Sequence, residues 1–175
     1  MNKIFTLTGI SSFISIVIYL NIIQTAYNPL YQLMSELALG EQGFLMLVAF
    51  LSFALAVISV SHTLNHSILK TLLWLAALAL AAAGIFKLGE ATVLHVALVA
   101  IAFVLIVLSM YLTPRLTSTT TRQTFICWGL GFSTALFVAL GQGILPIGLA
   151  QRLATLSIFI WLAWLAITHQ REHYE

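Results

Sequence analysis

Charged residues are scarce in this chain. Lysine, arginine, aspartate and glutamate together make up 7% of its 175 residues, whereas a soluble domain carries about 25%. So few charges cannot cover a water-exposed surface, and 61% of the residues are hydrophobic, with a mean hydropathy of +1.07. Most of the surface must therefore face lipid. The small net charge of +2 says nothing about nucleic acid, but no basic run interleaved with aromatic residues appears, so we expect no nucleic-acid partner.

Cysteine is nearly absent as well. The single Cys127 excludes an intrachain disulfide, and we interpret it as a small core residue. His62 and His66 have the spacing of a metal-binding pair on a helix, but no third ligand lies near them in the sequence. We therefore expect neither a metal nor another cofactor.

Long apolar runs dominate the rest of the chain. A helix crosses the hydrocarbon core of a membrane with roughly 20 apolar residues, and six runs approach that length. The sequence therefore predicts an all-α fold, a polytopic bundle of six transmembrane helices that forms a single membrane domain over residues 1–175. The predicted helices cover about residues 4–26, 43–62, 70–88, 91–112, 124–145 and 151–168.

Two of these runs carry small or hydroxyl side chains along one helical face. In the first run, a stripe at spacings of three and four indicates a helix packed in the bundle rather than a signal peptide. Its members are Thr8, Ser11, Ser12, Ser15 and Tyr19. In the fifth run, small residues at every fourth position predict close packing against a neighbouring helix. Its members are Gly131, Ala135, Ala139 and Gly143.

Lysine and arginine residues are sorted unequally between the two ends of the predicted bundle. The end with the termini holds Lys3, Lys70, Arg115, Arg122 and Arg171, and the other end holds Lys87 and Arg152. Because cytoplasmic loops are enriched in these residues, we expect both termini in the cytoplasm. The chain is then a multi-pass protein of a cytoplasmic (inner) membrane, and its other end faces outward.

The segment between the first two runs has its own local signals. Pro29 disfavours the α conformation in the residue before it, so the first helix should end there. Ser35 is a candidate helix cap, and Gly40 permits the conformation that ends a short helix. We predict a short amphipathic helix that lies at the outer interface of the membrane, or dips under it, and carries Glu36.

Polar residues gather at the predicted outer end, and we expect a ligand-binding site there. The candidate residues are Tyr27, Ser35, Glu36, Lys87, Glu90, His95, Gln142 and Arg152. A carboxylate at membrane depth needs a partner, so we expect Glu36 to pair with Arg152 or Lys87. We also expect the short helix to bring Glu36 against His95. Both a structural ion pair and a working site fit this pattern.

Several of these residues resemble a family pattern. In chain order the pattern consists of Tyr27-Asn28-Pro29, Ser35-Glu36-Leu37, Gly40, Phe86, Leu94-His95, Gly148 and Gln151-Arg152. It is similar to the bacterial and archaeal membrane proteins grouped as domain of unknown function 998, over about residues 8–168. Members often have an acidic residue soon after the phenylalanine, where this chain has Lys87 first and Glu90 later. The resemblance implies a six-helix fold in a bacterial or archaeal membrane and no established activity.

Four functions fit these observations. We favour a site that binds or handles a lipid or other amphiphile with an anionic or zwitterionic head at the outer leaflet. A structural or accessory subunit that packs against another membrane protein is an alternative. A membrane enzyme with Glu36 or His95 as general base is another. A small transporter is the fourth, although no charge lies at mid-span to relay ions.

Overall fold

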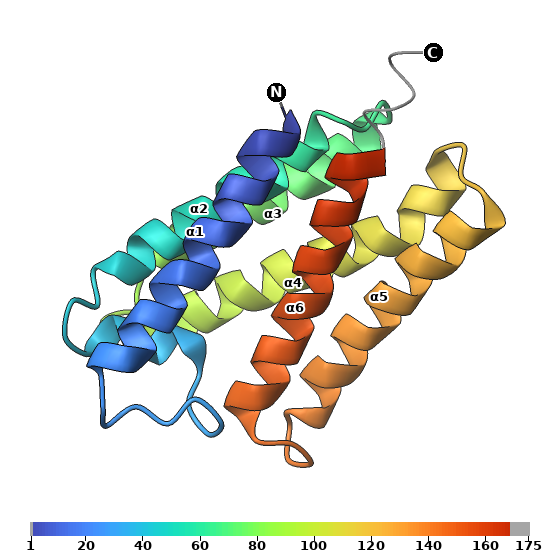
Figure 1. Ribbon diagram of the computed structural model, residues 1–175. Helices are drawn as coiled ribbons and strands as arrows, with labels where there is room; N and C mark the ends of the chain where they lie inside the picture. Colours follow the sequence, from blue (N-terminus) through green and yellow to red (C-terminus); the bar gives the residue numbers. More distant parts are fainter. Residues whose placement is uncertain (1, 169–175) are drawn as a thin grey trace.

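The computed structural model describes residues 2–168, and all regular structure among them is helical. Six α-helices and one short 3-10 helix follow each other along the chain (Figure 1). They are α1 (Asn2–Ile23), η1 (Met34–Leu39), α2 (Leu45–Ser61), α3 (Ser67–Ile85), α4 (Thr92–Leu116), α5 (Thr121–Leu140) and α6 (Ile147–Thr168).

Five of the helices, α1, α3, α4, α5 and α6, are long and apolar enough to cross a membrane. The remaining long helix, α2, is equally apolar but has 17 residues, slightly fewer than the roughly 20 that a span requires. The chain is therefore a multi-pass membrane protein.

Most helix boundaries differ from the expected ranges by a few residues, and local hydrogen bonds are visible at two of them. α5 begins at Thr121 because the Thr120 hydroxyl accepts from the backbone N–H of Gln123, whose side chain accepts from the N–H of Thr120. α1 ends at Ile23, before the expected position. The side chain of Gln24, the next residue, donates to the carbonyl oxygens of Leu37 and Glu41 in and after η1.

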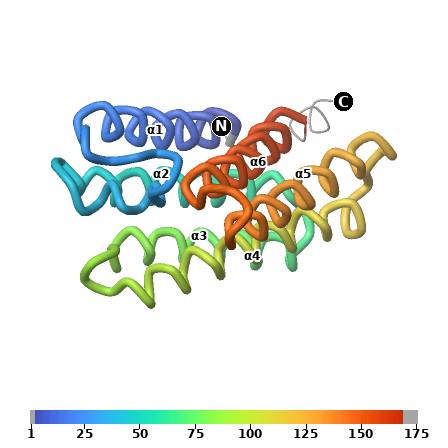
Figure 2. The backbone as a smooth tube through the Cα atoms, turned by 90° about the horizontal axis from the view of Figure 1, so that it is seen from below, coloured from blue at the N-terminus to red at the C-terminus, as the bar shows by residue number. Residues whose placement is uncertain are grey.

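Each long helix packs against the next in the chain, and α6 also contacts α1 and α2 (Figure 2). Three phenylalanine rings mark the centre where α1, α2 and α6 meet. Phe13, Phe53 and Phe159 form edge-to-face pairs with ring centroids 4.8–5.5 Å apart, an arrangement that aromatic quadrupoles favour. Trp161 of α6 is fully buried in the same core.

The hydroxyl stripe predicts that the first helix packs in the bundle, and α1 does so against α2 and α6, but the stripe itself does not form the buried face. Ser11 and Ser15 are exposed, and most of the stripe lines a shallow groove on the outside of the bundle between α1 and α2. The interior face of α1 is formed instead by large apolar residues such as Phe13 and Leu20. Burial of these larger side chains outweighs the gain from packing small polar ones, so the stripe turns outward.

Helices α4 and α5 form a V. They lie close together at their connection, where a side chain at Gly131 would meet Met110 and Tyr111 at 3.3 Å, and they diverge toward the other end (Figures 1 and 2). The prediction of close packing therefore fails beyond Gly131. Ala135 and Ala139 line an open groove instead of contacting α4 closely.

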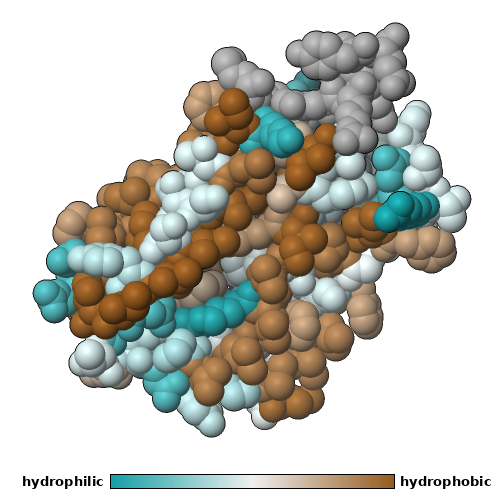
Figure 3. All heavy atoms as spheres, viewed as in Figure 1, coloured by the Kyte–Doolittle hydropathy of each residue, from teal (hydrophilic) through white to brown (hydrophobic). Residues whose placement is uncertain are grey.

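The basic residues lie at the two ends of the bundle. Lys3, Lys70, Arg115 and Arg122 share the end that holds the start of α1 and the α2–α3 and α4–α5 connections; Arg171 lies outside the described residues. Lys87 and Arg152 lie at the opposite end with η1, which we call the η1 end. Between the ends, mainly hydrophobic residues cover the face shown in Figure 3.

Candidate functional site

The short helix η1 begins at Met34 because of its own glutamate. The Glu36 carboxylate accepts from the backbone N–H of Leu33 at 2.8 Å and so satisfies a donor that precedes the helix. Ser35, which we expected to cap the helix, is instead one of its buried residues, with 3% of its surface exposed. Gly40 follows directly, and a Cβ there would collide with the side chain of Gln24.

The η1 helix is inserted into the end of the bundle, with one of its faces turned inward. Leu37 is completely buried, and η1 contacts α1, α2 and α6. The amide of Gln24 at the end of α1 donates to the carbonyls of Leu37 at 2.9 Å and Glu41 at 2.8 Å. The apolar face and these bonds fix the position of η1 relative to the long helices.

Arg152, one turn into α6, holds the chain segment that leads into η1. Its Nη1 donates to the carbonyl oxygens of Pro29 at 2.5 Å, Gly148 at 3.0 Å and Gln32 at 3.4 Å. Its Nη2 donates to the hydroxyl of Tyr27 at 2.7 Å. We call these five residues the clasp. Hydrogen bonds from a charged donor are stronger than neutral ones, so the clasp joins the two segments firmly.

Gly148 allows the two segments of the clasp to approach. A Cβ at this position would lie 2.3 Å from the carbonyl oxygen of Gln32 and 2.6 Å from that of Pro29. A bond between backbone groups extends the contact: the N–H of Leu149 donates to the carbonyl of Leu30 at 3.0 Å. The Gly148 and Gln151-Arg152 elements of the family pattern therefore have a structural role.

Tyr27 forms the base of the clasp. Its hydroxyl is shared between the carbonyls of Gln32 at 3.1 Å and Leu33 at 3.0 Å, and the guanidinium of Arg152 lies 5.7 Å from its ring centroid. Burial raises the pKa of the Tyr27 phenol above its ordinary value of 10.0, against the lowering effect of the bond and charge of Arg152. The phenol therefore stays a neutral donor at physiological pH.

The expected pairing of Glu36 with Arg152 is not formed. The carboxylate of Glu36 accepts from the Gln32 side chain at 3.0 Å and from the N–H of Leu33, and no ion pair joins it to Arg152 within residues 2–168. Arg152 binds carbonyl oxygens of the same segment instead, because these oxygens have no helical partner and lie nearer. The expected contact of Glu36 with His95 is also wrong: the residue of η1 that shares a cavity with His95 is Ser35.

Lys87 and Glu90 form a pair of their own in the α3–α4 connection. Their side chains are 2.8 Å apart and 46% and 68% exposed, so this is a surface ion pair of little energetic value. Lys87 is therefore not the partner of Glu36. Neither residue lines the cavity that contains Ser35 and His95.

His95 occupies the second turn of α4, and 2% of its surface is exposed. Its Nδ1 lies 2.8 Å from the carbonyl oxygen of Ala83 and 3.0 Å from that of Phe86, at the end of α3. Its ring also makes an edge-to-face contact with Phe50, at 5.5 Å between centroids. The other ring nitrogen, Nε2, is buried and has no hydrogen-bond partner among the described residues.

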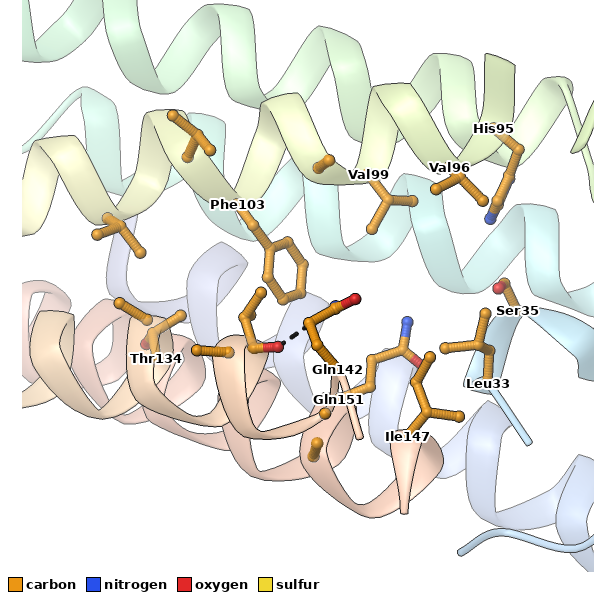
Figure 4. A pocket seen from close by; sticks show the side chains of 18 of the residues that line it. Leu33, Ser35, His95, Val96, Val99, Phe103, Thr134, Gln142, Ile147 and Gln151 are labelled. Atoms are coloured by element: carbon orange, nitrogen blue, oxygen red, sulfur yellow. Dashed lines mark hydrogen bonds between the residues drawn. The ribbon is translucent and has the colours of Figure 1, made fainter. Parts of the chain in front are cut away.

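A cavity of about 660 Å³ lies in the V between α4 and α5 and is closed at its wide end by η1 and the start of α6 (Figure 4). Apolar side chains such as Val99 and Phe103 line most of it. The polar lining residues at the η1 end are Ser35, His95, Gln142 and Gln151. The cavity is therefore a groove with an apolar body and a polar end that contains no lysine, arginine, aspartate or glutamate.

The two glutamines of the groove differ in how they are held. The Oε1 atom of Gln151 accepts from the backbone N–H of Met34 at 2.7 Å, which fixes this amide. Gln142, in the exposed turn after α5, makes only a long 3.5 Å bond to the carbonyl of Val138. In Figure 4 the amide nitrogen of Gln151 points into the space below His95.

The structure thus divides the eight predicted site residues. Ser35, His95 and Gln142 meet in the groove; Tyr27, Glu36 and Arg152 lie in or beside the clasp; Lys87 and Glu90 stand apart. Sequence reasoning omitted Gln151 and the apolar lining from the site. The signal for Gln151 was its place beside Arg152 in the family pattern, whereas the apolar lining resembles any other lipid-facing stretch.

Fold and groove together define an α-helical, multi-pass membrane protein with a lateral groove at one end of the bundle. The chain belongs to the family described as protein of unknown function (DUF998), whose profile matches residues 7–168. This confirms the resemblance noted in the sequence. Comparison with curated proteins and with solved structures gives no match.

Proposed function

We propose that this protein binds or handles a lipid or other amphiphile, with the apolar chain in the α4–α5 groove and the head at the η1 end. We further propose that all six long helices span a cytoplasmic membrane, that both termini face the cytoplasm, and that η1 lies at the outer leaflet. The site would then take its ligand from the outer half of the bilayer.

The distribution of charge supports this orientation. Lys3, Lys70, Arg115 and Arg122 lie opposite the η1 end, and cytoplasmic ends are enriched in lysine and arginine. The 17 residues of α2 extend about 26 Å at the usual rise of an α-helix. That length nearly matches a hydrocarbon core of about 30 Å, so α2 spans with help from the turns at its ends.

The shape of the groove supports an elongated apolar ligand. Its lining on α4 runs from His95 to Tyr111, a distance of about 24 Å along the helix axis. Its volume of about 660 Å³ lies within the range of about 300–1,000 Å³ that is typical of small-molecule sites. A long apolar groove that is open to the bilayer suits a hydrocarbon chain.

The observation that carries the proposal is the unpaired Nε2 of His95 at the polar end of this groove. A buried polar atom without a partner is costly, and most such atoms in proteins are paired. A ligand head that supplies the missing hydrogen bond removes this cost.

The proposal is tested by native mass spectrometry of the protein purified in a mild detergent. We expect a discrete small-molecule adduct on the wild type and its loss in Ala135→Trp, because the larger side chain fills the groove that Ala135 lines. Leu136→Trp is the matched control, since Leu136 is the next residue of α5, is exposed and does not line the groove.

An adduct that persists in Ala135→Trp would contradict the groove as the binding site. A wild-type protein that carries no small molecule, or that instead carries another polypeptide in constant ratio, would contradict ligand binding. The second result would favour the accessory-subunit alternative.

A further inference from the structure

The polar end of the groove also specifies the chemistry of the ligand head, and this inference rests on the proposed function. We propose that the head is an uncharged hydroxyl group on a single hydrocarbon chain, as in a long-chain alcohol. This differs from the anionic or zwitterionic head that the sequence led us to expect.

The first argument is the protonation pattern of His95. Both backbone groups near its Nδ1 are carbonyl oxygens, those of Ala83 and Phe86, and carbonyl oxygens only accept hydrogen bonds. Nδ1 must therefore carry a proton. In the neutral ring the other nitrogen is then an acceptor, so the unpaired Nε2 presents a lone pair to the groove.

The second argument is the fixed orientation of Gln151. Its Oε1 atom is occupied by the N–H of Met34, so the amide NH₂ group is the part left to face the groove, as Figure 4 shows. The polar end thus offers an acceptor on α4 and a donor on α6, beside the hydroxyl of Ser35 and the amide of Gln142. A hydroxyl group both donates and accepts, so it can satisfy His95 and Gln151 together.

The third argument is the absence of an available cation in the groove. None of its lining residues is a lysine, arginine, aspartate or glutamate. Arg152 is engaged by the clasp and borders a different groove, between α1 and α6, and Lys87 is paired with Glu90. A phosphate or carboxylate head would face the lone pair of His95 without a compensating charge, and buried anions need one.

The test compares three probes with the same chain: 1-hexadecanol, methyl hexadecyl ether and hexadecyl phosphate. Each is titrated into the detergent-solubilised full-length protein, and occupancy is measured by native mass spectrometry. We expect the alcohol to bind about three- to tenfold more tightly than the ether, which lacks the donor for His95 Nε2. We expect the phosphate to bind more weakly than the alcohol.

His95→Asn provides the matched variant. The asparagine amide nitrogen can still donate to the Ala83 and Phe86 carbonyls in place of Nδ1, but no atom replaces Nε2. We expect this variant to bind the alcohol and the ether equally. The alcohol-to-ether ratio in the wild type tests the inference even if the variant does not fold.

The outcomes separate this inference from the proposed function. Equal binding of alcohol and ether, or tighter binding of the phosphate, with all binding lost in Ala135→Trp, would overturn the head assignment and leave the groove site intact. Failure of every probe to bind the wild type, or binding that Ala135→Trp does not reduce, would overturn both.

Discussion

Arg152 and Gln151 are neighbours in α6, but Arg152 belongs to the clasp and Gln151 lines the groove. Arg152 turns toward α1 and donates to three carbonyl oxygens and the Tyr27 hydroxyl. Gln151, one position earlier, turns toward α4, where the groove contains the unpaired Nε2 of His95. In the clasp, the guanidinium of Arg152 is hydrogen-bonded to the carbonyl oxygens and to the Tyr27 hydroxyl. At the polar end of the groove, His95 Nε2 has no hydrogen-bond partner among the described residues. The first arrangement stabilises the fold, and the second is suited to bind a ligand.

We expect the largest loss of stability from Arg152→Ala, which removes the central residue of the clasp. The change removes every bond from the guanidinium to the clasp, and the Gln32 carbonyl keeps only its bond from the Tyr27 hydroxyl. Because each charge-assisted bond contributes about 1.5–3 kcal/mol, we expect the free energy of unfolding to fall by about 3 kcal/mol or more. Chemical unfolding in detergent measures this. A variant as stable as the wild type would show that the clasp does not hold the fold together.

A smaller loss is expected from Gly148→Ala. The added Cβ would collide with the backbone oxygens of Gln32 and Pro29, and such overpacking costs about 1–3 kcal/mol. Gly129→Ala is the matched control, because a Cβ at Gly129 in the middle of α5 meets nothing within 4 Å. The control should be neutral or more stable by up to about 1 kcal/mol. Equal effects of the two changes would contradict the close approach at Gly148.

The smallest effect is expected from Glu36→Gln. Glutamine keeps an oxygen that accepts from the N–H of Leu33, so we expect a loss of less than about 1 kcal/mol. A double-mutant cycle with Arg152→Ala should give a coupling energy close to zero, because the two side chains do not pair. A coupling energy above about 1 kcal/mol would show that Glu36 and Arg152 interact as the ion pair that the sequence led us to expect.

The sequence predicts the membrane class and the family, because apolar run length and the pattern around Ser35-Glu36 and Gln151-Arg152 are local properties. It also predicts that Tyr27 and His95 lie at the same end of the bundle. It fails for the partner of Arg152. Opposite charge favoured Glu36, but backbone carbonyls carry no sequence signal, and the turn at Pro29 brings several of them within reach of the guanidinium.

The groove between α4 and α5 could not be predicted from the sequence either. Small residues at every fourth position of α5 predict close packing, and this holds at Gly131, where α4 is near. Ala135 and Ala139 continue the same pattern but lie where the two helices diverge. The angle between α4 and α5 is a tertiary property that a local residue pattern does not encode.

The most direct test of the account is a high-resolution structure of the wild-type protein in lipid nanodiscs. We predict an elongated density in the groove between α4 and α5, with a head atom within hydrogen-bond distance of His95 Nε2, while Arg152 keeps its bonds to the clasp. A structure in which α4 and α5 close against each other, or in which a side chain of the protein itself satisfies Nε2, would contradict the ligand site.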